Sequence, residues 1–108
     1  MKDSLAARRY AKSLIGLAKE KNVLKDIFND MSLIKNTVSI NKDLQLLLKS
    51  PVVNTDKKQD ILSAVFKGNL NKLSSLFLQL ISSKKRESLI QQIANSFIEQ
   101  YKVLNNIV

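Results

Sequence analysis

The sequence predicts an all-α fold, a compact bundle of six helices, on three observations. Apolar residues recur at three- and four-residue spacing in six successive segments, as on one face of a helix. The 108 residues include two glycines and one proline, which leaves little turn chemistry for a sheet protein. No segment of useful length alternates apolar and polar residues as a half-buried strand does. A chain of this length holds one core, so we expect 1–108 to form a single domain.

The first predicted helix spans 4–21. Asp3 or Ser4 can cap its first amides, and lysines near its end complement the helix dipole. A surface helix needs one stripe that faces the core, yet this helix has two side by side. The first stripe contains Ala7, Ala11, Leu14 and Ala18, and the second contains Ala6, Tyr10, Ser13 and Leu17.

The second predicted helix, 23–39, has one apolar face. That face contains Leu24, Ile27, Phe28, Met31, Ile34 and Val38. A short third helix is expected at 42–49, with Asn41 as its cap and with Leu44, Leu47 and Leu48 pointing inward. Pro51 ends it, because proline disfavours the helical conformation in the residue before it.

The fourth predicted helix begins at Thr55 or Asp56. Asp56 and Gln59 have the spacing of a capping box, in which each side chain accepts or donates a bond at the helix start. Its apolar face contains Ile61, Leu62, Val65 and Phe66. Gly68 suits the position just past its end, where left-handed backbone is common.

The fifth predicted helix, 71–83, is apolar around most of its circumference. Its apolar residues, with the one before it, are Leu70, Leu73, Leu76, Phe77, Leu78, Leu80 and Ile81. After a brief loop around Lys84 and Lys85, a sixth helix is expected at 86–105. Its buried side contains Leu89, Ile90, Ile93, Phe97, Tyr101 and Leu104.

The composition argues against an enzyme. Histidine and cysteine are both absent, so no thiolate nucleophile, imidazole base or Cys/His metal site can form. The acidic residues are spread out, and there is no glycine-rich phosphate loop. We therefore expect no catalytic, cofactor-binding or metal-binding residues. No apolar run reaches the roughly 18 residues of a membrane span.

The formal net charge of +9 indicates either an anionic partner or a solvated lysine surface. We favour the solvated surface because the cations are scattered, apart from short clusters at 8–9, 57–58 and 84–86. All four phenylalanines lie on apolar stripes, which predicts a core role for them and not a role in stacking on bases. The alternative function is a basic helical RNA-binding domain of the transcription-antitermination type.

The surplus apolar surface of the first and fifth helices is the more informative signal. Such a helix is either central in a bundle or half exposed as a docking surface, and for 71–83 alone we favour the central position. Side by side, the two helices would form a groove for an amphipathic helix of a partner. The candidate partner-binding residues are Ala6, Tyr10, Ser13, Leu17, Leu73, Leu76 and Leu80.

The order of motifs along the chain resembles one known family. The first helix has the pattern Ala-x-x-Tyr-Ala-x-x-Leu from Ala7 to Leu14, and a short helix ends in Leu-x-x-Pro at 48–51. Lys-x-x-Ile-Leu-x-x-Val-Phe follows at 58–66, and an Arg-containing turn at 84–86 leads into a long last helix. Together they make the chain similar to the delta subunit of rotary ATP synthases and its mitochondrial counterpart, the oligomycin-sensitivity conferral protein.

The resemblance implies a stator component that does no chemistry and resists the torque of the rotor. It implies a six-helix domain on the catalytic head, with the N-terminal helix of an alpha subunit in a groove between the first and fifth helices. Family members continue into a second, mixed α/β domain that meets the b subunits of the peripheral stalk. This chain ends at Val108, where that domain begins, so we expect the N-terminal domain alone. The implied location is peripheral, at the cytoplasmic face of the bacterial inner membrane, with no nucleic acid bound.

Overall fold

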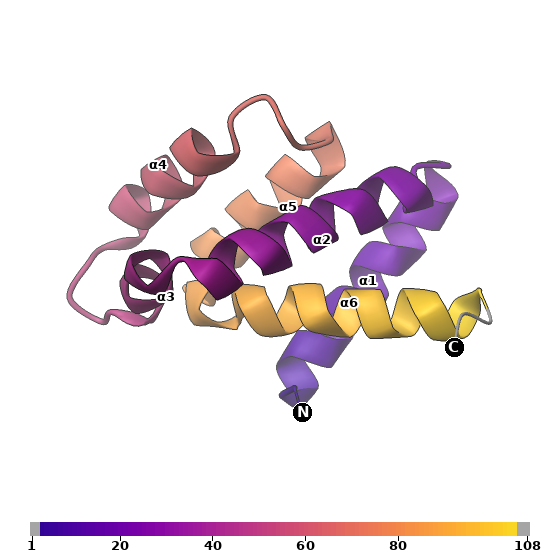
Figure 1. Cartoon of the computed structure of the whole chain (residues 1–108), viewed down its shortest axis with the longest axis horizontal. Helices are drawn as coiled ribbons and strands as arrows, with labels where there is room; N and C mark the ends of the chain where they lie inside the picture. The colour runs from indigo at the N-terminus through magenta and orange to yellow at the C-terminus, as the bar shows by residue number, and fades with distance from the viewer. Residues whose placement is uncertain (1–2, 106–108) are drawn as a thin grey trace.

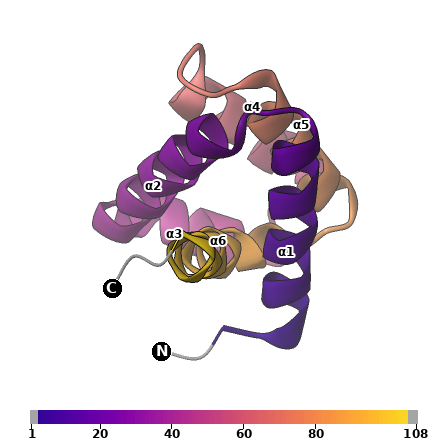
Figure 2. The same ribbon diagram turned by 90° about the vertical axis from the view of Figure 1, so that its right-hand side faces the viewer.

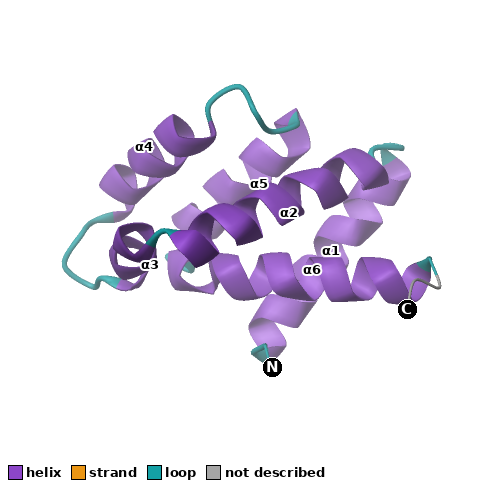
Figure 3. Cartoon of the chain, viewed as in Figure 1, coloured by secondary structure: helices purple, strands orange, loops and turns teal. Residues whose placement is uncertain are grey.

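A computed structural model of the chain describes residues 3–105 and contains six α-helices joined by short connections (Figure 1). The helices are α1 (Leu5–Glu20), α2 (Leu24–Ile40), α3 (Lys42–Lys49), α4 (Thr55–Phe66), α5 (Lys72–Ser83) and α6 (Ile90–Leu104). A 3₁₀ turn, η1 (Glu87–Leu89), precedes α6, so the helix predicted at 86–105 begins as a tighter turn. Residues 3–105 contain no strand (Figure 3), and the predicted all-α fold is confirmed.

Polar caps set the start of four of the six α-helices. The side-chain oxygens of Ser4, Asn41, Asn54 and Asn71 each accept a backbone N–H from the following turn at 2.9 to 3.1 Å. Each bond satisfies one of the N–H groups that a helix start leaves without a partner and contributes about 1 kcal/mol. Ser4 and Asn41 were predicted as caps, and both are confirmed.

α4 begins at Thr55, one of the two predicted starts, but its cap is not the predicted one. Asn54 is the cap, one residue before Thr55 and two before Asp56. The expected capping box does not form, because Gln59 Nε2 donates to Ser63 Oγ one turn further on, at 3.3 Å. Asparagine is as good an N-cap as aspartate, so the local sequence offered three adjacent candidates that composition alone does not rank.

A residue with left-handed backbone conformation follows the end of α4, and another follows the end of α5. Gly68, predicted just past the end of α4, lies two residues after Phe66 with a φ of 74° and is confirmed there. After α5, Lys85 takes the same role with a φ of 57°, which a residue with a Cβ adopts at some cost. The turn allows the Arg86 N–H to donate to the Ile81 carbonyl at 3.0 Å, so the last carbonyls of α5 keep partners.

The last helix, α6, lies at the centre of the bundle. It packs most closely on α1 and α2, which flank it on two sides when the molecule is viewed along the α6 axis (Figure 2). The helix α3 packs on α2, while α4 packs on α5 and α5 also touches α2. The radius of gyration, 13.1 Å, is that of a compact domain of this length.

All six helices contribute to a single hydrophobic core. Its largest fully buried apolar side chains are Phe97, Leu14, Ile27, Met31, Ile34, Leu62, Ile81 and Ile93. Three of the four phenylalanines predicted for the core are buried. The fourth, Phe28, is partly buried and stacks on Tyr101, with ring centroids 4.1 Å apart. None of the four rings is therefore free to serve as a stacking platform.

A buried carboxylate anchors the start of α5. Asp30 lies on the buried side of α2, and its Oδ2 accepts the Asn71 N–H at 2.8 Å and the Ser74 hydroxyl at 2.7 Å. A negative charge at a helix start is favourable because the unpaired N–H groups point toward it. This contact fixes the N-terminal end of α5 against α2.

A buried ion pair joins α4 to the segment before α6. Lys58 Nζ lies 3.9 Å from Glu87 Oε1, with the two side chains only 9% and 4% exposed. Lys58 Nζ also donates to the carbonyl of Leu48, at the end of α3, at 3.3 Å. One amine therefore links three parts of the chain on the side that holds α3 and α4.

Candidate partner-binding face

The seven predicted partner-binding residues all lie outside the buried core. Leu17, Leu76 and Leu80 are 41%, 51% and 45% exposed, and Ser13 is also exposed. The remaining three are partly buried. We call this set the α1–α5 face: Ala6, Tyr10, Ser13 and Leu17 on α1 with Leu73, Leu76 and Leu80 on α5.

An aromatic contact connects α1 to α5. The rings of Tyr10 and Phe77 meet edge to face, with centroids 6.4 Å apart and planes at 76°. Leu73 and Leu80 lie four residues before and three after Phe77, so they share its side of α5. In the same way Ser13 follows Tyr10 by three residues on α1. The contact therefore joins the α1 stripe to α5 at one point, beside the predicted leucines.

Phe77 is the residue of this region that the sequence interpretation left out of the site. It is buried, and its ring is the element of α5 that Tyr10 touches. A signal was present, because Phe77 lies between Leu73 and Leu80 at helical spacing. Phe77 supports the face from below, while the leucines beside it remain accessible.

The prediction that α5 occupies the centre of the bundle is wrong. Its buried side contains Phe77 and Ile81, but next to that side Leu76 and Leu80 are about half exposed. The central position belongs to α6, so α5 has neighbours on part of its circumference only. Its buried side also includes two serines, Ser74 and Ser82, which an apolar count does not reveal.

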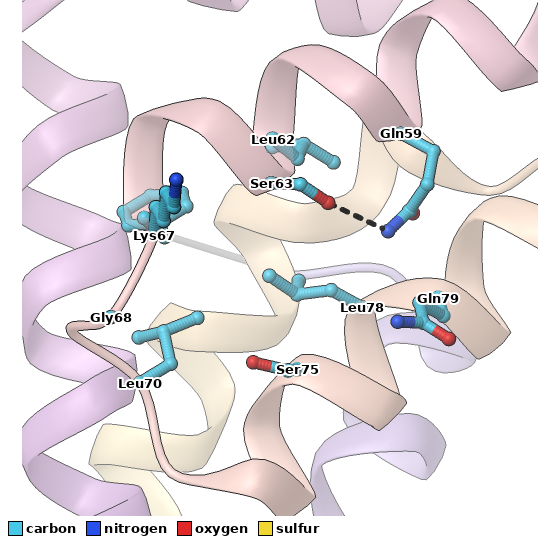
Figure 4. Close-up of a pocket in the computed structure, with 10 residues that line it drawn as sticks. Gln59, Leu62, Ser63, Lys67, Gly68, Leu70, Ser75, Leu78 and Gln79 are labelled. Atoms are coloured by element: carbon cyan, nitrogen blue, oxygen red, sulfur yellow. Dashed lines mark hydrogen bonds between the residues drawn. The ribbon is translucent and has the colours of Figure 1, made fainter.

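Two hollows lie elsewhere on the described part of the chain. A cleft of about 200 Å³ between α4 and α5 presents the amides and hydroxyls of Gln59, Ser63, Ser75 and Gln79 above leucines (Figure 4), and its charged lining residue is Lys67. A larger hollow of about 590 Å³, beside 50–56, contains the ion pair described above. In the second hollow the Lys58 amine is held by Glu87 and by the Leu48 carbonyl.

One carboxyl group outside the face has a perturbed acidity. Burial raises the pKa of Asp3, and the nearby charge of Glu99 raises it further, while Arg8 and Lys35 oppose the change. Its Oδ1 has no hydrogen-bond partner among the described residues. Asp3 lies beside the start of α1 and away from the exposed leucines.

Across residues 3–105, no group of three or more His, Cys, Asp or Glu side chains is placed to hold a metal ion. Across that range none of the helices combines the length and the apolarity of a bilayer-spanning segment.

Comparison with known proteins identifies the family. The model of the family "ATP synthase delta (OSCP) subunit" matches residues 6–108. A protein named ATP synthase subunit delta from Cytophaga hutchinsonii is 39% identical over 102 residues, covering 94% of this chain and 56% of that protein. Proteins of the same name from Chlorobium phaeobacteroides strain BS1 and Christiangramia forsetii are 37% and 33% identical over 97 and 107 residues. They cover 90% and 99% of this chain, which itself covers 54% and 58% of their lengths.

The chain thus spans a little over half the length of these curated relatives. The family match covers nearly all of the chain and includes both helices that form the α1–α5 face. The chain belongs to the ATP synthase delta (OSCP) subunit family.

Proposed function

We propose that this chain is a stator component of a rotary ATP synthase and that its α1–α5 face binds the N-terminal helix of an alpha subunit. The bound helix would lay its apolar side across the exposed leucines and link the catalytic head to the peripheral stalk. The function is mechanical. The chain holds the head against the torque of the rotor and does no chemistry of its own.

The observation that carries this proposal is the exposure of leucines on both helices around one aromatic contact. Leu17, Leu76 and Leu80 keep roughly half of their surface in water, although they flank the buried contact between Tyr10 and Phe77. Covering the rest of each leucine gains about 1 kcal/mol from the hydrophobic effect. An amphipathic helix, with apolar residues at three- and four-residue spacing, matches a face of this kind.

The remainder of the proposed function rests on the resemblance and the family membership. In this proposal a second domain of the subunit, separate from residues 1–108, binds the b subunits of the peripheral stalk. Residues 1–108 act as the N-terminal domain of that subunit. The subunit is peripheral, at the cytoplasmic face of the bacterial inner membrane, and it meets the membrane through the complex only. We assign no cofactor to it.

A binding titration tests the proposal. The full chain should bind a synthetic peptide of the alpha-subunit N-terminus, and the peptide should become helical when bound. Because the contact is mainly apolar, the dissociation constant should change little between low and high salt. Absence of saturable binding by calorimetry at high peptide concentration would contradict the proposal.

Competition with RNA separates this function from the RNA-binding alternative, which the family match does not support. For a nucleic-acid partner, log K falls with log salt by about 0.9 per neutralised phosphate on duplex DNA and by somewhat less on single strands. We expect no displacement of the peptide by RNA at moderate salt. Efficient displacement would contradict binding by an apolar face.

A further inference from the structure

Two cations lie along the edges of the α1–α5 face. Arg9 lies three residues after Ala6 and four before Ser13, so it stands next to the face on α1. Lys72 lies four residues before Leu76 and occupies the corresponding position on α5. Both side chains are exposed. The apolar strip therefore has a positive charge on each side.

Neither cation has a structural task within the described part of the chain. In residues 3–105 the one ion pair joins Lys58 to Glu87, and no hydrogen bond from the Arg9 or Lys72 side chain is present. No carboxylate lies within one helical turn of either residue on its own helix.

The balance of charge on the two helices points the same way. α1 carries four cationic side chains and one carboxylate, Glu20, while α5 carries Lys72 and no carboxylate. Glu20 lies eleven residues beyond Arg9, at the far end of α1. The carboxylate nearest Lys72, that of Asp30 on α2, is buried and bonded to Asn71 and Ser74, so the surface that these two helices present is mainly positive.

Resting on the docking function proposed above, we infer that the occupant is an acidic amphipathic helix whose two polar edges carry carboxylates facing Arg9 and Lys72. An α-helix with its side chains is about 10 Å across. The polar residues that border its apolar side therefore lie opposite the residues that border the α1–α5 face. Carboxylates there meet Arg9 and Lys72, and lysines there meet like charges.

These exposed charges select the partner and speed its approach more than they hold it. Ion pairs at the edge of an interface are screened by water and salt and add little affinity. Their main effects are on the association rate and on the rejection of partners with the wrong charge. The apolar residues between them determine the dissociation rate.

Three peptides with one apolar face test the inference on the full chain. The first has glutamates at both polar edges, the second has the same glutamates moved to the outward side, and the third has lysines at the edges. At low salt the edge-glutamate peptide should associate about threefold faster than the outward-glutamate peptide, with similar dissociation rates. The difference should disappear at high salt.

Charge-reversed proteins locate the effect. The double variant Arg9→Glu, Lys72→Glu should lose the preference for edge glutamates and associate faster with the edge-lysine peptide. The control variant Lys42→Glu, Lys57→Glu makes the same change in net charge at exposed positions on α3 and α4. This control should keep the original preference.

Equal association rates for the two glutamate peptides at low salt would overturn the inference while leaving apolar docking intact. The same holds if the control variant reverses the preference as fully as the Arg9 and Lys72 variant does, because net charge then explains the result. Failure of all three peptides to bind at any salt would contradict the docking function and this inference with it.

Discussion

On one side, α1 packs closely against α6 through a stripe that includes the fully buried Ala7, Ala11 and Ala18; on the other, it meets α5 through the rings of Tyr10 and Phe77. Alanines allow two helix backbones to approach closely and leave no apolar surface open. An edge-to-face ring contact holds the helices together at one point, and the leucines around it stay accessible.

Polar contacts strengthen the difference between the two sides. The Ser4 N–H donates to Gln92 Oε1 at 2.8 Å, and Gln100 Nε2 donates to the Arg8 carbonyl at 3.2 Å, so α1 and α6 are tied near both ends of their crossing. The α5 side of α1 has the ring contact and the exposed Leu17. The same helix therefore has one side that completes the fold and one side that is available to a partner. Four variants test this division between a packed side and an accessible side.

Ile81→Asp should unfold the protein. Ile81 is fully buried on α5, one residue after the exposed Leu80. A buried charge without a partner costs about 4 kcal/mol or more, a large share of the total stability of a small domain. Loss of the helical circular dichroism signal at room temperature is the expected result. A folded variant would show that the inner side of α5 is not part of the core.

Glu87→Ala should lower the free energy of unfolding by about 3 kcal/mol, because it leaves the Lys58 amine buried without its counter-charge. Replacing both residues together, as Lys58→Met with Glu87→Leu, should restore most of that loss. Urea denaturation measures both effects. Peptide affinity of the folded fraction should not change, because this ion pair lies on the α3–α4 side. Reduced affinity would contradict the separation of the two regions.

Asp30→Ala should lower the free energy of unfolding by about 2 kcal/mol, because the Asn71 N–H and the Ser74 hydroxyl lose a buried acceptor. Asp30→Asn, which keeps one acceptor oxygen, should cost less. Both variants should also weaken peptide binding, since the anchor of α5 places Leu73 and Leu76. Unchanged affinity in a destabilised Asp30→Ala protein would show that this anchor does not position the face.

Asp3→Asn should have the smallest effect, and it should depend on pH. Because the folded pKa of Asp3 is raised above the ordinary 3.8, the folded state holds this proton more tightly than the unfolded chain. Its contribution to stability therefore falls as pH rises from 3.8 through the folded pKa. The asparagine variant should be at least as stable as the parent at neutral pH, and the difference should close in acid. Unfolding in urea across this pH range measures it; a variant less stable at neutral pH would refute the assignment.

The spacing of apolar residues, together with capping residues and proline, was sufficient to predict the helices. The third helix was predicted at 42–49, the same bounds as α3, because Asn41 and Pro51 mark its two ends chemically. The start of α4 at Thr55 was among the two predicted, but its cap, Asn54, was missed because three adjacent polar residues can each act as a cap. The 3₁₀ turn before α6 was missed as well, because its residues fit either kind of helix.

The sequence did not predict which residues form contacts between different helices. Lys58 and Glu87 belong to different helical segments, and no spacing rule connects them. The burial of Asp30 could have been predicted, because it lies three residues after Ile27 and four before Ile34 on the buried side of α2. Its hydrogen-bond partners, Asn71 and Ser74, could not be predicted from spacing. The position of α5 at the edge of the bundle could not be predicted either. Apolar residues around most of a helix do not show on which side no other helix packs.

Leu76→Asp is the most direct test of whether this side of α5 binds the partner. Leu76 is half exposed on α5, while Ile81 on the same helix is fully buried. Helical content and affinity for the alpha-subunit peptide should be measured together on this variant, with Ile81→Asp as the unfolded reference. We expect a folded protein whose peptide binding is weaker by several kcal/mol, as for a charge buried without a partner. A folded variant with full affinity, or an unfolded one, would contradict a docking role for this side of α5.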